Sequence, residues 1–225
     1  MSLGSAGIDS GKDGFLAVLA ADGITLLEFF PTPKLSDGSY NIPEMKRIVG
    51  TLRGRVGLVA LEHPLPMPEE DPRSTFMQGI GIGLWMCALH GEVPFVTVEP
   101  REWKDEMGVT VPSAPRGSRP KPPTVFAGLG AKEIRRRVGT LRRRVKEGYS
   151  PTPEEQAGID FAKATSDRSS ARKKAAKGLS EGLAQRLYPG VDFRRTPKCT
   201  TLHDGKCEAA LLAKVAWRRF LGRAS

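Results

Sequence analysis

Two acidic residues near the end of the chain, Asp204 and Glu208, lie four positions apart in a segment whose pattern predicts a helix. Residues four apart share one side of a helix. Leu211, Leu212 and Val215 continue that side as an apolar stripe, so we expect both carboxylates to extend a buried face. Like charges at this spacing repel each other, and no lysine or arginine shares their side within a turn. A divalent cation is therefore their expected partner.

Two more carboxylates stand where apolar segments stop. Asp9 ends the short segment 6–9, and Glu62 ends the continuous apolar run 56–62. Carboxylates without histidine form the ligand set that Mg²⁺ prefers. Two such ions about 4 Å apart can activate a water and stabilise the leaving oxygen of a phosphodiester. We therefore expect these residues, with Asp204 and Glu208, to be metal ligands and catalytic residues; they are called the four acids below.

The 225-residue chain is basic, with a formal charge of +10 at pH 7. The excess is confined to one segment. Residues 101–198 hold 23 lysines and arginines against 11 acidic residues, whereas the rest of the chain holds 12 against 14. This distribution favours a nucleic-acid grip in one region and a cation site in the other.

The composition also excludes several classes of protein. Three cysteines are too few for a disulfide framework and indicate a reducing compartment. No apolar run is long enough for a transmembrane helix, and residues 1–5 lack the basic start and apolar core of a signal peptide. We expect a cytoplasmic protein with no membrane partner, long enough to bury its core as one domain.

The order of apolar runs predicts an α/β protein with a mixed sheet. Asp22 and Gly23 separate two apolar runs and predict a hairpin, so the first three segments form an antiparallel meander. The run 56–62 is typical of a central strand covered on both faces. The expected strands are 6–9, 15–20, 24–30, 56–62 and 95–98, and the expected helices before the basic segment are 41–52 and 74–90.

The basic segment opens with a Pro- and Gly-rich loop at 111–124. Three helices are expected to follow it, at 131–146, 152–164 and 167–187, and a capping-box pattern starts the second at Thr152. Their basic side chains are expected to lie along phosphate backbones, although solvated surface helices would show the same pattern. The candidate DNA-binding residues are Lys12, Arg135, Arg136, Arg142, Arg143, Lys173 and Lys174.

Each of the four acids has a simpler interpretation when taken alone. Asp204 could complete a capping box with Thr201. Glu62 could be an ordinary strand-end residue, and Asp9 could form a turn. Only the conjunction of all four favours a metal site.

Histidines and cysteines near the acids offer further alternatives. His63 and His203 each adjoin a proposed ligand, and could assist proton transfer or serve a structural role. Cys199, His203 and Cys207, at four-residue spacing, form a weaker candidate for a zinc site, because structural zinc takes four ligands.

Several segments carry a family resemblance when they are taken in order. They are Gly-Ile-Asp-Ser-Gly at 7–11, Ala-Leu-Glu at 60–62, the glycine-bearing helix from Met-Gln-Gly at 77–79, the helix 169–189 ending in Arg-Leu-Tyr-Pro, and the closing helix at 204–208. Together they cover most of the chain. The ordered set resembles the RuvC-type Holliday junction resolvases, nearest the phage-encoded branch.

The resemblance implies an RNase H-like fold, in which residues 1–225 form a single nuclease domain with an inserted basic helical segment at 112–165. The four acids would coordinate two Mg²⁺ or Mn²⁺ ions, and an activated water would attack a phosphate near the crossover of a four-way (Holliday) or branched DNA junction. The enzyme would act as a homodimer through the helix 74–90. It would serve DNA recombination and repair in the cytoplasm of a bacterial or phage-infected cell.

The chain departs from the family pattern in two places. The last two acids are four residues apart, where bacterial members usually have three, but both spacings keep one helical face. Bacterial members also carry an aromatic residue shortly after the strand-end glutamate. Here that stretch is Leu-Pro-Met at 65–67 and the first aromatic is Phe76, so Met67 is a candidate DNA contact.

Two other functions stay open from the sequence. An ATP-binding enzyme of the actin and sugar-kinase superfamily would share the fold and the first loop, but it needs a second glycine-rich phosphate loop that is not evident here. A non-catalytic nucleic-acid-binding protein would use the basic helices and would leave the four acids unexplained.

Overall fold

The computed structural model describes residues 3–65, 71–110 and 122–224. Met67 and most of the loop expected at 111–124 therefore lie outside the described residues. The chain divides into two compact units, one formed by Met1–Thr110 with Lys177–Ser225 and the other by Val111–Ala176. The insertion expected at 112–165 falls within the second unit, which extends further, to Ala176.

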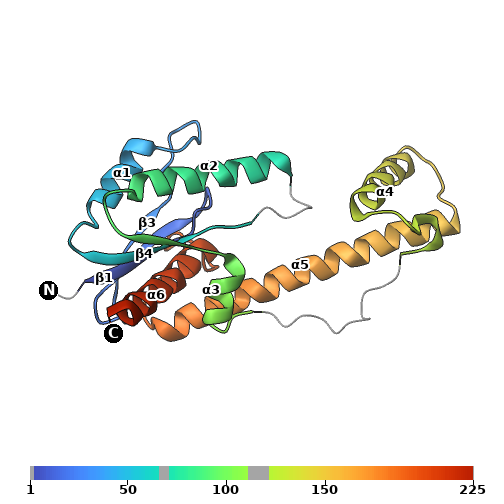
Figure 1. Cartoon of the computed structure of the whole chain (residues 1–225). Coiled ribbons are helices and arrows are strands. Elements are labelled where there is room, and N and C mark those ends of the chain that lie inside the picture. Colours follow the sequence, from blue (N-terminus) through green and yellow to red (C-terminus); the bar gives the residue numbers. More distant parts are fainter. Residues whose placement is uncertain (1–2, 66–70, 111–121, 225) are drawn as a thin grey trace. The chain divides into compact units, whose positions relative to one another are not determined.

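A mixed five-stranded sheet forms the centre of the first unit, as the sequence predicted (Figure 1). Its order is β3-β2-β1-β4-β5. The first three strands pair antiparallel, while β4 runs parallel to β1 and β5 parallel to β4. This α/β layout is consistent with the general RNase H-like arrangement. The strands are β1 (Gly4–Ile8), β2 (Phe15–Leu19), β3 (Leu26–Pro31), β4 (Val56–Glu62) and β5 (Phe95–Val98).

Helices cover both faces of this sheet. Alternate residues of β4 point to opposite faces, so that Val59 and Leu61 pack toward α1 (Ile42–Gly50) and α2 (Pro72–Leu89). Leu58 and Ala60 pack toward α6 (Asp204–Ala224) on the other face. Figure 1 shows α1 and α2 on one side of the strands and α6 on the other. Burial on both faces explains why β4 is apolar throughout.

Helix α6 lies directly on strand β1. The Ser5 hydroxyl donates a hydrogen bond of 2.8 Å to the Ala213 carbonyl. A Cβ placed on Gly7 would stand 2.2 Å from the Ala213 backbone nitrogen, which no real side chain tolerates. The glycine therefore permits backbone contact between strand and helix, and this contact fixes the start of α6 relative to the end of β1.

The expected helices 41–52 and 74–90 correspond to α1 and α2, and a helix that the sequence analysis did not predict follows β5. The Asn41 side chain accepts the Glu44 backbone N–H at 3.2 Å and caps α1, as expected. The additional helix is α3 (Pro100–Glu106). Arg219 of α6 binds Glu102 and Glu106 of this helix at 2.9 and 2.8 Å, which attaches α3 to α6.

The second unit is helical. A short 3₁₀ turn, η1 (Thr124–Phe126), precedes α4 (Ala131–Lys146), and α5 (Pro153–Leu187) begins after a loop. Phe126 is buried, and a Cβ on Gly158 would lie 2.6 Å from its ring, so η1 packs closely on α5. The predicted bounds of α4 match the observed ones, with Val138 and Leu141 buried on its apolar side.

The two helices predicted at 152–164 and 167–187 are one continuous helix, α5, so this prediction was wrong. The capping box at its start is confirmed: the Thr152 N–H donates to Glu155 Oε2 at 2.9 Å, and the Glu155 N–H donates to Thr152 Oγ1 at 3.2 Å. Residues 165 and 166, which lie between the two predicted helices, include no proline or glycine that would end a helix. Thr165 instead bonds the Phe161 carbonyl within the helix at 2.9 Å.

Within the described ranges, no helix combines the length and the apolar character needed to cross a membrane.

Candidate active site

The ends of two parallel strands bring Asp9 and Glu62 to the same edge of the sheet. Ile8 of β1 pairs with Leu61 of β4, so the next residues, Asp9 and Glu62, are neighbours at the carboxyl ends of the strands. The start of α6 covers this edge, because a Cβ on Gly205 would lie 2.9 Å from Asp9 Oδ2.

All four acids interact electrostatically at this edge. Asp204 begins α6 and Glu208 follows one turn later. The charges of both act on Asp9, and the charge of Glu208 also acts on Glu62. The structure thus brings together four side chains that are separated by up to 199 positions of sequence.

Burial raises the pKa of the Asp9 carboxyl to about 7 and that of Glu62 to about 8. The negative charge of Glu208 raises both values further. For Asp9, the Gly11 backbone N–H, which donates to Oδ1 at 3.0 Å, acts in the opposite direction. Near neutral pH, Glu62 is therefore mostly protonated and Asp9 about half protonated when no cation is bound beside them.

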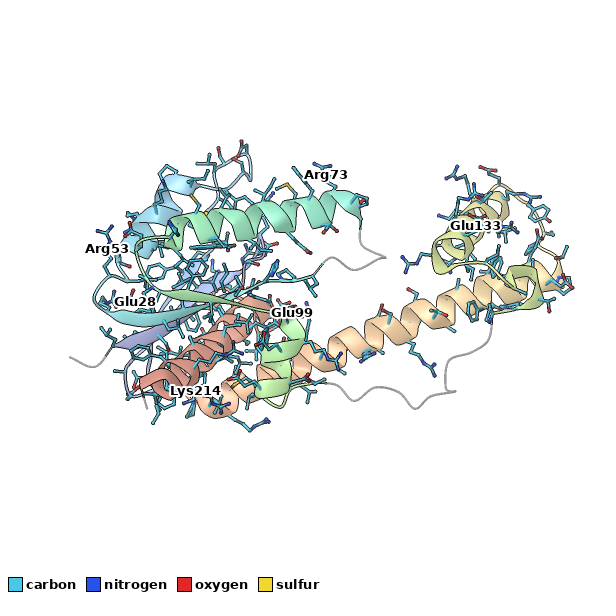
Figure 2. The ribbon with its side chains drawn as sticks, in the orientation of Figure 1. Glu28, Arg53, Arg73, Glu99, Glu133 and Lys214 are labelled. Atoms are coloured by element: carbon cyan, nitrogen blue, oxygen red, sulfur yellow. The ribbon has the colours of Figure 1, made fainter. Side chains whose placement is uncertain are left out.

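Helix α3 supplies two side chains to the site that sequence analysis missed. The Trp103 indole Nε1–H donates to Glu62 Oε1 at 2.9 Å, in fully buried surroundings. Lys104 Nζ lies 2.9 Å from Glu208 Oε1. A signal for this helix exists in the sequence, since Pro100 can open a first turn and Glu102 follows Glu99 at capping-box spacing. In the structure, the Glu99 N–H donates to Glu102 Oε2 at 3.3 Å (Glu99 is labelled in Figure 2).

Lysines pair with the two acids of α6. Lys104 pairs with Glu208, and Lys177, near the end of α5, pairs with Asp204. Burial acts to raise the pKa of Asp204, but the hydrogen bond and charge of Lys177 outweigh it, so this pKa lies below its usual value. A divalent cation was the expected partner of these acids because no basic residue shares their side of α6. The structure shows that lysines from other elements, α3 and α5, pair with them instead.

The donor set of the four acids fits hard divalent cations in its chemistry. All donors are carboxylate oxygens, and a divalent charge would relieve the raised pKa values of Asp9 and Glu62. Among the described residues, however, no three carboxylate, imidazole or thiol groups are gathered in a ready metal-binding cluster. Metal binding would therefore need side-chain rearrangement, with Asp204 and Glu208 leaving their lysines.

The simpler interpretations of single acids fare differently. Asp204 is the first residue of α6, so it is not the third-position partner of Thr201 in a capping box. The Asp9 carboxylate does accept a turn hydrogen bond, from Gly11. Glu62 is buried and hydrogen-bonded to Trp103, unlike an ordinary strand-end residue.

The neighbouring histidines and cysteines have structural surroundings. The His203 ring packs edge-on against Phe15 with ring centroids 4.8 Å apart, and burial lowers its pKa. His63 is exposed and donates its backbone N–H to the Val98 carbonyl at 2.9 Å. Cys207, in the first turn of α6, is buried in the apolar core, whereas Cys199 contacts the Thr196 hydroxyl.

The candidate DNA-binding residues are spread over both units. Lys12 is exposed in the turn after β1. Arg135, Arg136, Arg142 and Arg143 are exposed on α4, and Arg136 forms a two-bond pair with Glu133. Lys174 is exposed on α5. Lys173 belongs to the same helix, but its side chain, like Met67, lies outside what the structure describes.

Comparisons with known proteins add no assignment. No protein-family model matches the chain. No curated protein matches it either.

Proposed function

We propose that the protein is a metal-dependent, structure-selective DNA endonuclease of the RuvC type, with an RNase H-like fold. In this proposal it resolves four-way or otherwise branched DNA junctions by hydrolysing phosphodiester bonds with two Mg²⁺ or Mn²⁺ ions. The observation that carries the proposal is the placement of the half-buried Asp9 and the buried Glu62, two acids with raised pKa values, side by side beneath the acidic start of α6.

In this proposal, each residue has a role that follows from the element that carries it. Asp9 and Glu62 would hold the ions from the sheet, and Asp204 and Glu208 would hold them from α6. The bound ions would activate a water and stabilise charge on the leaving oxygen. Trp103 keeps the Glu62 carboxylate oriented through its 2.9 Å hydrogen bond. Lys104 and Lys177, released from their acids, would present positive charge to the phosphodiester anion.

The outer side of α2 supports the proposed homodimer. Phe76 and Met86 are 68% and 39% exposed, and burying these apolar side chains against a partner would be favourable. A Cβ on Gly79 or Gly83 would meet nothing within 4 Å, so this side leaves room for a second helix to approach closely. The spacing of these four residues places them on one side of α2.

A cleavage assay tests the proposal. A labelled four-way DNA junction is incubated with the protein and Mg²⁺, with EDTA replacing Mg²⁺ in a parallel reaction. We expect Mg²⁺-dependent cleavage. Asp9→Asn should reduce its rate about 100-fold or more, as the loss of one group that stabilises the transition state typically does. Asp22→Asn, a matched change in the exposed β2–β3 hairpin at the opposite edge of the sheet, should cleave normally. Cleavage that persists in EDTA or in Asp9→Asn contradicts the proposal.

A non-catalytic nucleic-acid-binding protein is the second candidate. The ion pairs Lys104–Glu208 and Lys177–Asp204 favour it, because they already neutralise two of the four acids without a metal. This function predicts junction binding without turnover, and it predicts that Mg²⁺ leaves the thermal stability of the protein unchanged.

A further inference from the structure

A pocket of about 350 Å³ lies in the second unit. Its apolar lining comes from Val125 and Phe126 of η1 and from Leu141 of α4. Phe126 and Leu141 are only 1% and 8% exposed, and the Phe126 ring is packed against Gly158. The pocket therefore has a fixed apolar floor that the buried Phe126 ring supports from below, and its volume is at the lower end of the range for small-ligand sites.

Polar side chains complete the pocket wall. They are Arg136, Arg137 and Thr140 of α4 and Glu155 of α5. The Tyr149 hydroxyl and the Thr152 N–H both donate to Glu155 Oε2, at 2.8 and 2.9 Å, which fixes this carboxylate in place.

Glu133 holds the two pocket arginines in position (Glu133 is labelled in Figure 2). It accepts two hydrogen bonds of 2.9 Å from Arg136 and one of 3.1 Å from Arg137. A guanidinium has five N–H donors, so these bonds leave donors on both arginines for a ligand. The arginines are thus oriented before any ligand arrives, which lowers the entropy lost on binding.

The charge of the pocket differs from that of the helix around it. Two arginines and Glu155 give the pocket wall both donors and acceptors, and Glu133, which binds the arginines from outside the lining, offsets part of their charge. Helix α4 as a whole carries eight basic residues and one acidic residue. A phosphate would suit the helix surface but would gain little from an apolar floor. The combination suits a planar, uncharged heterocycle that is attached to a polyanion.

We infer that this pocket binds an unstacked nucleobase from a single-stranded stretch of DNA, while the basic surface of α4 follows the adjoining phosphates. A base offers an apolar face to the half-buried Val125 and hydrogen-bonding edges to Arg137 and Glu155. Arginine side chains, exposed here at Arg136 and Arg137, are among the usual partners of unpaired bases. The inference rests on DNA being the partner in the proposed function, but not on the nuclease chemistry.

Binding of the full-length protein in EDTA tests this inference, because cleavage plays no part under these conditions. The probes are a short single-stranded oligonucleotide carrying one 2-aminopurine and the fully paired duplex of the same sequence. Thr140→Trp fills the pocket from an exposed helical position, and Thr140→Ala is its matched control. Arg137→Gln removes a pocket arginine, whereas Arg143→Gln removes one charge from the same helix outside the pocket lining.

We expect Thr140→Trp to weaken single-strand binding about tenfold, which corresponds to the loss of one bound base. Duplex binding should change by less than about twofold, because a paired base does not enter the pocket. Arg137→Gln should weaken single-strand binding more than Arg143→Gln, and the 2-aminopurine fluorescence change should disappear in Thr140→Trp. Equal losses on both probes, or none, overturn the inference even if junctions are cleaved. Failure of the wild-type protein to bind any DNA probe would instead overturn the proposed function along with it.

Discussion

At the scale of single residues, the site is defined by acids that burial has made weak. Asp9 and Glu62 have pKa values of about 7 and 8 because the sheet edge and α6 remove them from water. Glu208, the acid whose charge acts most strongly on both, is held by Lys104 at 2.9 Å. Ionising Asp9 and Glu62 in the folded chain is therefore unfavourable, and a bound divalent cation would stabilise their ionised forms.

The raised pKa values of Asp9 and Glu62 predict how the stability of the folded chain depends on pH. Both acids bind a proton more tightly in the folded chain than in the unfolded chain, so their contribution to stability is complete below about pH 4 and is lost as the pH rises through about 7 and 8. Without divalent metal, the free energy of unfolding should fall between pH 5 and 8 by more than about 1.4 kcal/mol, the equivalent of one pKa unit. Chemical unfolding in EDTA at several pH values measures this fall.

The control for this prediction is the double variant Asp9→Asn with Glu62→Gln, in which neither side chain titrates. Its stability should vary less between pH 5 and 8 than that of the wild-type protein. Added Mg²⁺ should restore wild-type stability at pH 8 but not change the variant. A wild-type protein whose stability rises over this range would contradict the assigned pKa directions.

The hydrogen bond from Trp103 to Glu62 gives a second prediction at this scale. Trp103→Phe keeps an aromatic ring but leaves a buried carboxylate oxygen without its donor, so we expect a loss of about 1–3 kcal/mol of stability in urea unfolding. The matched control is Trp217→Phe, which loses a 3.0 Å bond to the Ala21 carbonyl on the same helix-covered face. Only Trp103→Phe should also weaken stabilisation by Mg²⁺. Equal Mg²⁺ effects in both variants would contradict a role for Trp103 at the site.

At the scale of elements, the site depends on how closely α6 approaches β1. The contact at Gly7 and the Ser5–Ala213 hydrogen bond fix the height of α6 above the sheet. That height decides how close Asp204 and Glu208 lie to Asp9. Helix α3 adds Trp103 and Lys104 from the side, attached to α6 through Arg219.

Gly7→Ala should therefore damage both stability and site. The new Cβ would stand 2.2 Å from the Ala213 nitrogen and force α6 outward, at a cost of about 1–3 kcal/mol. Stabilisation by Mg²⁺ should fall at the same time, measured as the shift in thermal midpoint on adding the ion. Gly50→Ala, at the end of α1 with open space around its Cβ, should change neither quantity appreciably. Full retention of the Mg²⁺ shift in Gly7→Ala would show that this contact does not position the acids.

The elements also show what sequence patterns can and cannot predict. The bounds of β4, β5 and α4 could be read directly, because apolar periodicity and turn residues mark both ends. The single long α5 could not, since its polar middle resembles a helix boundary. The ion pairs of Lys104 and Lys177 depend on contacts between elements far apart in sequence, which no local pattern of residues encodes.

At the scale of the whole molecule, acid and base are separated along the chain. The strands and α6 provide the four acids, and the basic excess falls in residues 101–198. Such a division matches a protein that holds metal with one part and a polyanion with another.

The salt dependence of DNA binding tests the basic part. Replacing Arg142 and Arg143 with Gln should reduce the slope of log Kd against log salt by up to about two, since each lost phosphate contact removes about 0.9. The exposed pair Arg47 and Arg53 of the first unit, changed to Gln, provides a control of equal charge. An unchanged slope in the α4 variant would show that this helix does not meet the phosphate backbone.

The central claim is that the four acids converge to bind divalent cations. The most direct measurement is an anomalous difference map from crystals soaked in Mn²⁺. We predict density between Asp9, Glu62 and the start of α6, with Asp204 and Glu208 turned away from Lys177 and Lys104. A map without density at this edge, in which both lysine pairs persist, would contradict the claim.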